Sequence, residues 1–148
     1  MLVRDAMTPH AEWISPDISL TEVALRMRNR HIGCLPVGEK DRLIGMITDR
    51  DIACRGVAEG LNPGTAKARQ VMTSGITWCF EDETVDEAAS RMEEKQIHHM
   101  PVLSRQKRMV GILSLSDLAL KGPKGLFGQL TKLASRDAGR HAPEAAAH

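Results

Sequence analysis

Two short stretches of the chain place a hydroxyl residue three positions before an aspartate, directly after an apolar strand pattern. The first pair is Thr48 and Asp51, and the second is Ser114 and Asp117. A β-branched apolar run broken by one glycine precedes each pair and predicts a short buried strand. The hydroxyl residue is a favourable helix N-cap, and negative charge is favoured in the first helical turn. Each pair could bind a ligand or could form only a capping box, and an isolated pair is more often the latter.

The two pairs belong to a repeat that covers most of the chain. A shift of 65 residues aligns Met7–Thr8 with Met72–Thr73, Trp13 with Trp78, Glu22 with Glu87, and Pro36–Val37 with Pro101–Val102. One residue inserted before Arg108 changes the shift to 66, which aligns Gly45 with Gly111 and Asp51 with Asp117. A single-residue slip in a polar turn indicates two copies of one structural unit.

The residue pattern of each copy predicts secondary-structure elements in the order strand, helix, strand, strand, helix. Helices are expected to begin at Ser19 and Thr84, where a glutamate three positions later completes a capping box. The second strand of each copy contains Pro36 or Pro101, which favours a sheet edge or a strand end. This order of strands and helices predicts an α+β fold. Roughly fifty residues with three strands cannot bury both faces of their sheet alone, but two such units can. Two βαββα units would pack about a pseudo-two-fold axis.

The repeat divides the chain into five segments. We expect a first repeat at 1–57, a linker at 58–67, a second repeat at 68–122, a C-terminal helix at 123–137 and a flexible tail at 138–148. The C-terminal helix is short and only mildly basic. We therefore expect it to cap the core or to form a dimer seam, and not to attach to a membrane.

Composition excludes several classes of protein. Aromatic residues make up 3% of the chain, which argues against a stacking surface for single-stranded nucleic acid. A net charge of +1 provides no basic field for DNA or an anionic membrane. No secretory core follows Met1, and no apolar run approaches the roughly 18 residues of a membrane span. The three cysteines show no CxxC spacing, so we expect reduced thiols in a cytoplasmic protein.

The ordered pattern Met-Thr, Pro-Val and Gly-x-Ile-Thr-x-x-Asp resembles the cystathionine-β-synthase (CBS) domain, and it occurs twice, with Leu and Ser in place of Ile and Thr in the second copy. The resemblance covers Val3 to Gly122 and implies a tandem CBS pair, or Bateman module. Members of this family bind adenosine-containing ligands, such as AMP, ADP, ATP, NAD or S-adenosylmethionine, in clefts between paired repeats. The resemblance therefore implies an adenine nucleotide as a regulatory ligand. It also implies a homodimer of CBS pairs that signals to a separate effector protein.

The resemblance assigns roles to both pairs. Asp51 and Asp117 would hold the ribose hydroxyls of a ligand, and Thr48 and Ser114 would contact ribose or phosphate. An ionised carboxylate can accept two hydrogen bonds from a vicinal diol, so this role is chemically sensible. It is also compatible with helix capping.

The two copies differ around these pairs, so the two clefts should differ in affinity or ligand. Arg50 of the first copy stands where the second has Ser116, and it could pair with a phosphate or be a solvated helix charge. The second copy has His98 and His99 where the first has glycine and cysteine. Family members often place a basic residue there, facing the phosphates. The resemblance therefore adds the whole segment to the site, namely His98, His99, Met100 and Pro101.

Adjacent histidines also suggest a metal, but no cysteine or carboxylate cluster accompanies them, and we expect no metal site. The tryptophans at 13 and 78 could stack on adenine or serve only packing. The family also recognises adenine through backbone groups of the first strand, which adds to the site Ile14, Ser15, Thr77, Trp78 and Cys79.

Catalysis finds little support, because the chain has no nucleophile elbow, no Walker-type phosphate loop and no HExxH motif. We expect no enzyme and no catalytic cofactor. The leading hypothesis is a regulatory module that senses an adenosine-containing ligand. One alternative is a dimeric adaptor without a ligand. Another is an enzyme that uses the histidine pair and a metal, which would require metal in the purified protein.

Overall fold

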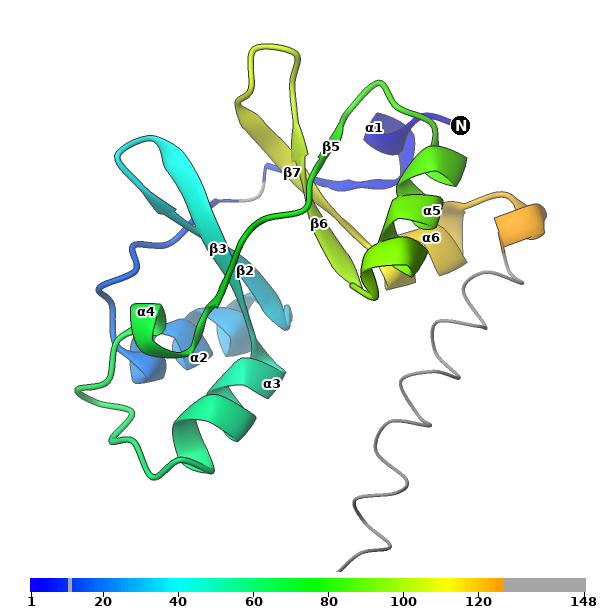
Figure 1. Ribbon diagram of the computed structural model, residues 1–148. Coiled ribbons are helices and arrows are strands. Elements are labelled where there is room, and N and C mark those ends of the chain that lie inside the picture. Colours follow the sequence, from blue (N-terminus) through cyan, green and yellow to red (C-terminus); the bar gives the residue numbers. More distant parts are fainter. Residues whose placement is uncertain (11, 127–148) are drawn as a thin grey trace, which may run out of the picture. The chain divides into compact units, whose positions relative to one another are not determined.

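The chain folds into two compact units that do not coincide with its two sequence repeats (Figure 1). The computed structural model describes residues 1–10 and 12–126. The first-repeat unit is Ala11–Ile76, and the second-repeat unit is Met1–His10 with the chain from Thr77 onward. The segment that leads into each repeat therefore packs with the other repeat. We call these two segments, 1–10 and 66–76, the lead-ins.

The first-repeat unit builds a three-stranded antiparallel sheet in the order β2-β3-β4. Its elements are α2 (Leu20–Arg30), β2 (Cys34–Glu39), β3 (Arg42–Thr48), α3 (Asp49–Asp51), the π-helical η1 (Ile52–Val57), α4 (Ala68–Val71) and β4 (Thr73–Ser74). Helix α3 continues directly into η1, whose C-cap is Ala58. Ile14 forms an isolated parallel bridge with Val37 of β2.

The second-repeat unit builds a four-stranded sheet in the order β1-β7-β6-β5. Its elements are α1 (Val3–Ala6), β1 (Thr8–Pro9), β5 (Cys79–Phe80), α5 (Val85–Lys95), β6 (His99–Leu103), β7 (Met109–Ser114), α6 (Leu115–Lys121) and the 3-10 turn η2 (Lys124–Leu126). Among the described strands of this sheet, β5 and β6 pair in parallel, and the other neighbours are antiparallel. The two sheets thus repeat one plan, in which a lead-in strand borders the strand that ends at the hydroxyl residue.

The predicted α+β fold with two repeats of this kind is confirmed, while several local expectations are corrected. Strand β6 lies between β7 and β5, so Pro101 is not on an edge strand. It precedes Val102, where the pairing with β5 begins, so its missing N–H interrupts no bond there. The capping box at Ser19 is only half formed, because Glu22 pairs with Arg26 instead. The predicted C-terminal helix beyond 126 and the tail at 138–148 lie outside the described residues.

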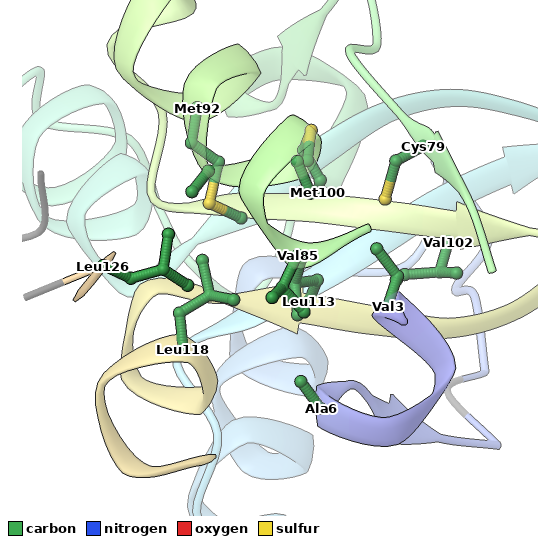
Figure 2. Packing of buried hydrophobic residues seen from close by; sticks show 12 residues of the cluster. Val3, Ala6, Cys79, Val85, Met92, Met100, Val102, Leu113, Leu118 and Leu126 are labelled. Atoms are coloured by element: carbon green, nitrogen blue, oxygen red, sulfur yellow. The ribbon is translucent and has the colours of Figure 1, made fainter. Parts of the chain in front are cut away.

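Each lead-in completes the apolar core of the unit that it joins. In the second-repeat unit, Val3 and Ala6 of α1 are fully buried among side chains of α5, β6, β7 and α6 (Figure 2). In the first-repeat unit, the matching residues Ala68 and Val71 of α4 are fully buried against the side chains of α2, β2 and β3. Burial of apolar area therefore holds the lead-ins in place.

The glycine of each repeated Gly-x-Ile/Leu motif lets the lead-in approach its sheet closely. A Cβ on Gly45 would lie 2.6 Å from the Thr73 carbonyl oxygen, and one on Gly111 would lie 2.5 Å from that of Thr8. No side chain fits there without displacing β4 or β1. The glycine that breaks each apolar run is thus a packing requirement.

We predict that Gly111→Ala lowers the free energy of unfolding by about 1–3 kcal/mol, because overpacking must push β1 away from β7. Urea unfolding followed by circular dichroism measures this change. Gly64→Ala is the matched control, since its nearest neighbour is the exposed Asn62 side chain at 3.3 Å. The control should change stability by less than about 0.5 kcal/mol. Equal effects of the two substitutions would contradict the packing role of Gly111.

Candidate functional site

The Thr48–Asp51 pair forms a complete capping box where β3 meets α3. The Asp51 amide donates to Thr48 Oγ1 at 3.1 Å, and the Thr48 amide donates to Asp51 Oδ2 at 2.9 Å. The second carboxylate oxygen, Oδ1, lies 4.0 Å from Arg55 Nε. The Asp51 side chain is 14% exposed.

The Ser114–Asp117 pair repeats this geometry where β7 meets α6. The Asp117 amide donates to Ser114 Oγ at 3.0 Å, and the Ser114 amide donates to Asp117 Oδ2 at 2.9 Å. Here Oδ1 accepts a hydrogen bond from the Thr8 hydroxyl of the lead-in at 3.4 Å. In both copies one carboxylate oxygen caps the helix, and the other makes a longer contact that a ligand could replace.

A cation in each final helix ties that helix to the lead-in. Arg55 Nη1 donates to the carbonyl oxygens of Val71 and Met72 at 3.4 and 3.3 Å. Lys121 Nζ, at the matching position of α6, donates to the Ala6 carbonyl at 3.3 Å. These contacts place the lead-in strand beside the capping box in both units.

Of the two histidines, His99 lies closer to the box. It is the cross-strand partner of Ser114, and such partners share one face of a sheet. His98 precedes β6, and its carbonyl accepts the Leu115 amide at 2.9 Å, which anchors the start of α6. In the first copy Cys34 pairs with Thr48 in the same register. The residue opposite the hydroxyl is thus polar in one copy and a buried thiol in the other.

Several candidate residues have buried side chains. Met100 and Cys79 have no exposed area, Ile14 has 1%, and Pro101 is buried as well. Such residues could offer a ligand only backbone groups without rearrangement of the core. Burial, with a smaller contribution from Glu83, raises the pKa of the Cys79 thiol to about 12. In contrast, the side chains of Ser15, Arg50 and Ser116 are exposed, and that of Thr77 is half-buried.

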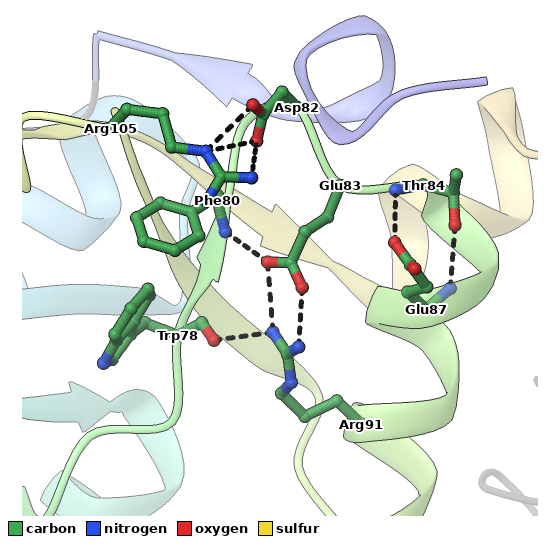
Figure 3. Close-up of polar contacts among 8 residues, drawn as sticks. All are labelled: Trp78, Phe80, Asp82, Glu83, Thr84, Glu87, Arg91 and Arg105. Atoms are coloured by element: carbon green, nitrogen blue, oxygen red, sulfur yellow. Dashed lines mark hydrogen bonds and ion pairs between the residues drawn. The ribbon is translucent and has the colours of Figure 1, made fainter.

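The two repeated tryptophans have different surroundings. Trp13 packs over Gly38 of β2, where a Cβ would lie 2.5 Å from its ring. Trp78 is 36% exposed and meets Phe80 edge to face, with ring centroids 4.8 Å apart (Figure 3). Arg105 stacks on the Phe80 ring at 4.1 Å and also binds Asp82 at 2.8 Å. The second copy therefore presents an aromatic and cationic surface beside β5.

An ion pair between two half-buried side chains holds this surface in shape. Arg91 Nη2 lies 2.6 Å from Glu83 Oε1, and Arg91 Nη1 also donates to the Trp78 carbonyl (Figure 3). Burial alone would raise the pKa of the Glu83 carboxyl, but hydrogen bonds from Arg91 and from the Phe80 amide outweigh it and lower that pKa. The first copy has Ile18 in place of Glu83 and therefore lacks this pair.

Sequence reasoning missed Thr8 and the ion-pair residues. The Met-Thr repeat was a usable signal for Thr8, because a hydroxyl recurs at the end of both lead-ins. Its partner, however, is 109 residues away along the chain. The Glu83–Arg91 pair spans the start of α5, and nothing in its spacing distinguishes it from surface charges.

The family of CBS domains matches this chain at residues 3–55 and 68–122. The chain belongs to the CBS domain family. It is a pair of CBS repeats, a regulatory module. The match covers both lead-in helices, both capping boxes and the strands that carry them.

Two small bacterial proteins are similar along nearly their whole length. Hypoxic response protein 1 of Mycobacterium tuberculosis is 38% identical over 130 residues, which are 87% of this chain and 90% of that protein. The CBS domain-containing protein YhcV of Bacillus subtilis is 35% identical over 118 residues, 80% and 83% of the two chains.

Two solved structures are similar to this chain as well. The crystal structure of Hypoxic Response Protein I with two coordinated zinc ions matches with a TM-score of 0.72 at 38% identity, over 83% of this chain and all of that one. The CBS domain pair of MJ0100 was solved in complex with 5-methylthioadenosine and S-adenosyl-L-methionine. It matches with a TM-score of 0.72 at 30% identity, over 81% of this chain and 98% of that one.

Within residues 1–10 and 12–126, no group of three or more His, Cys, Asp or Glu side chains gathers so that it could hold a metal ion. In the same part of the chain, no helix is both long and apolar enough to cross a membrane.

We predict that Glu83→Gln lowers the free energy of unfolding by about 1–2 kcal/mol at pH 7. A lowered folded-state pKa stabilises the fold above the unfolded value, near pH 4.3, and this contribution is lost as the pH falls. The difference between wild type and variant should therefore shrink towards about pH 3. Urea unfolding at both pH values measures it. A difference that stays constant with pH would show that the Glu83 charge is unimportant.

Proposed function

We propose that this CBS pair binds an adenosine-containing ligand through Asp51 and Asp117 and signals to a separate effector protein. The observation that carries the proposal is the capping box, formed with the same geometry in both units. Oδ2 of each aspartate is committed to the helix, while Oδ1 makes only a 4.0 Å or a 3.4 Å contact. A ribose diol can replace such contacts without opening the cap.

The geometry at the start of α3 and α6 supports an anionic or diol-bearing ligand. The hydroxyls of Thr48 and Ser114 lie beside the carboxylates, and a hydroxyl can both donate and accept. We propose Arg50 and Ser116 as further contacts, since both are exposed and follow the hydroxyl residue by two positions. His99 adds a group that can carry positive charge near the Ser114 box.

The first-strand residues complete the proposed site. We propose that the backbone of Ile14, Ser15, Thr77, Trp78 and Cys79 recognises the adenine base, together with His98, Met100 and Pro101 at the start of the next strand. The exposed Trp78 ring could add a stacking face. The complex of MJ0100 with 5-methylthioadenosine and S-adenosyl-L-methionine supports this class of ligand, because that pair is 30% identical.

Signalling would follow from ligand contacts that differ between two arrangements of the module. A ligand shifts such an equilibrium only by its differential affinity for the two states. The Thr8–Asp117 bond is one contact that a bound ribose would exchange, and it joins the lead-in to α6. We propose a cytoplasmic homodimer without catalytic activity as the signalling form.

Isothermal titration calorimetry tests the proposal, with S-adenosylmethionine, 5-methylthioadenosine, AMP, ATP and NAD as probes. At least one probe should bind, and Asp51→Asn or Asp117→Asn should weaken it at least about tenfold. Asparagine retains an oxygen for the cap but loses the charge, so the fold should persist. A thermal shift that corresponds to ~2.7 kcal/mol at a hundred times the dissociation constant provides a second readout.

Asp5→Asn is the matched control. Asp5 Oδ2 accepts the Leu2 amide at 3.1 Å and so caps α1 as the two site aspartates cap their helices, but it lies outside the repeated motif. It should leave affinity unchanged. Failure of all five probes to bind would favour a dimeric adaptor without a ligand, and equal loss in all three variants would show a general effect on the fold.

A further inference from the structure

The turn between β6 and β7 is more basic than the matching turn of the first repeat. Residues 104–108 contain three cations and no carboxylate, whereas residues 38–42 contain two of each. The repeat alignment places Ser104 and Gln106 where the first repeat has Glu39 and Asp41. The one residue that is inserted in the second repeat, Lys107, is itself a cation. The difference between the copies therefore concentrates positive charge on one turn.

Hydrogen bonds to Ser104 close this turn. The Ser104 amide donates to the Arg108 carbonyl at 2.8 Å, and the Lys107 amide donates to the Ser104 carbonyl at 2.8 Å. The Ser104 hydroxyl accepts the Arg108 amide at 3.3 Å, and Ser104 is only 8% exposed. Lys107 and Arg108 are exposed on the closed turn. The backbone thus fixes where these two cations stand.

Most of the positive charge on the turn is not neutralised within the chain. Arg105 pairs with Asp82, with 2.8 Å between Nη2 and Oδ1. Among residues 1–10 and 12–126, neither Lys107 nor Arg108 has a hydrogen bond or ion pair through its side chain. Two cations of the turn therefore remain available to an anionic partner.

Two aromatic side chains adjoin the basic turn (Figure 3). The Arg105 guanidinium lies 4.1 Å from the centre of the Phe80 ring, and the Trp78 ring meets Phe80 edge to face. The chain has only two tryptophans, two phenylalanines and no tyrosine, so this pair is an unusual concentration. Tryptophan and arginine are among the residue types that carry most of the binding energy in protein interfaces.

The strand that carries the aromatic side chains is held in place from the helix side. Arg91 Nη1 donates to the Trp78 carbonyl at 2.9 Å, and the Glu83 carboxylate accepts the Phe80 amide. Arg91 and Glu83 also pair with each other. Because these contacts order the strand before any partner arrives, binding loses less conformational freedom there.

We propose that this surface of the second repeat binds an acidic segment of a partner protein. The docking surface consists of Trp78, Phe80, Arg105, Lys107 and Arg108, which all belong to the second-repeat unit. Carboxylates of the segment would pair with Lys107 and Arg108, and an apolar side chain would pack on Trp78. The proposal rests on the proposed function only because it gives the separate effector a place to dock, and it requires no bound ligand.

The size of the charged patch favours a protein segment over other anionic partners. Binding to a nucleic-acid backbone can neutralise about 6–10 phosphates, and recognition of anionic lipids uses clusters of about 4–8 Lys and Arg residues. Two free cations and a third that shares Asp82 are fewer than either partner requires. A short acidic peptide with apolar side chains matches both the few cations and the exposed Trp78 ring.

Fluorescence polarisation of the full-length chain without nucleotide tests the docking surface. A fluorescein-labelled peptide of Glu-Asp-Leu repeats should bind, and a neutral peptide of Gln-Asn-Leu repeats should bind at least about tenfold more weakly. Lys107→Gln/Arg108→Gln should weaken the acidic peptide at least about fivefold, and added salt should weaken it in wild type. Trp78→Ala should weaken it at least about threefold although the net charge is unchanged.

Lys40→Gln/Arg42→Gln is the matched control. It removes the same charge from exposed residues of the first-repeat turn, and Lys40 has a φ of 52° where Lys107 has 62°. The control should leave the affinity within about twofold of wild type. Melting temperatures by circular dichroism check that every variant folds. An equal loss in the control would show an effect of net charge alone and would overturn the proposal.

Three other results would also overturn the docking surface. These are no binding of the acidic peptide, full affinity in Trp78→Ala, and tighter binding of oligothymidine or of phosphatidylserine vesicles than of the peptide. Titration of the same protein with the adenosine-containing probes separates the two proposals. If the peptide binds while no adenosine-containing probe does, the docking surface stands and the sensing function fails. The reverse result overturns the docking surface alone.

Discussion

The reciprocal hydrogen bonds between a hydroxyl residue and an aspartate at each strand–helix junction are the constraint on which the rest of the structure depends. They fix where β3 becomes α3 and where β7 becomes α6. They also orient each carboxylate so that one oxygen faces the backbone and the other faces Arg55 in the first copy or Thr8 in the second. Since the glycine three positions before each hydroxyl residue admits the lead-in strand, the same motif sets both the packing and the candidate binding group.

Exchange of the lead-ins makes the two repeats interdependent. Residues 1–10 contribute buried side chains, a strand and the Thr8 hydroxyl to the second repeat, and residues 66–76 contribute buried side chains and a strand to the first. A change at Asp117 can therefore reach the N-terminus through one hydrogen bond. Such a link between a candidate ligand group and a distant segment suits a regulatory module better than an isolated cap would.

Much of this architecture could be predicted from the sequence, because the repeat supplied two independent observations of every element. The helix starts at Ser19 and Thr84 and the boxes at Asp51 and Asp117 follow from local hydrogen bonding, which spacing reveals. The exchange of lead-ins could not be predicted, since it depends on which core Val3 and Ala6 enter. The Glu83–Arg91 pair and the burial of Met100 could likewise not be predicted from the sequence, because both depend on tertiary contacts.

A crystal structure of the chain with S-adenosylmethionine or AMP bound tests the central claim most directly. The account predicts ribose hydroxyls within about 3 Å of Oδ1 of Asp51 or Asp117, while Oδ2 keeps its bond to the Thr48 or Ser114 amide. The Thr8 hydroxyl should then have left Asp117 wherever that site is filled. A ribose bound away from both aspartates, or a box that opens on binding, would contradict it.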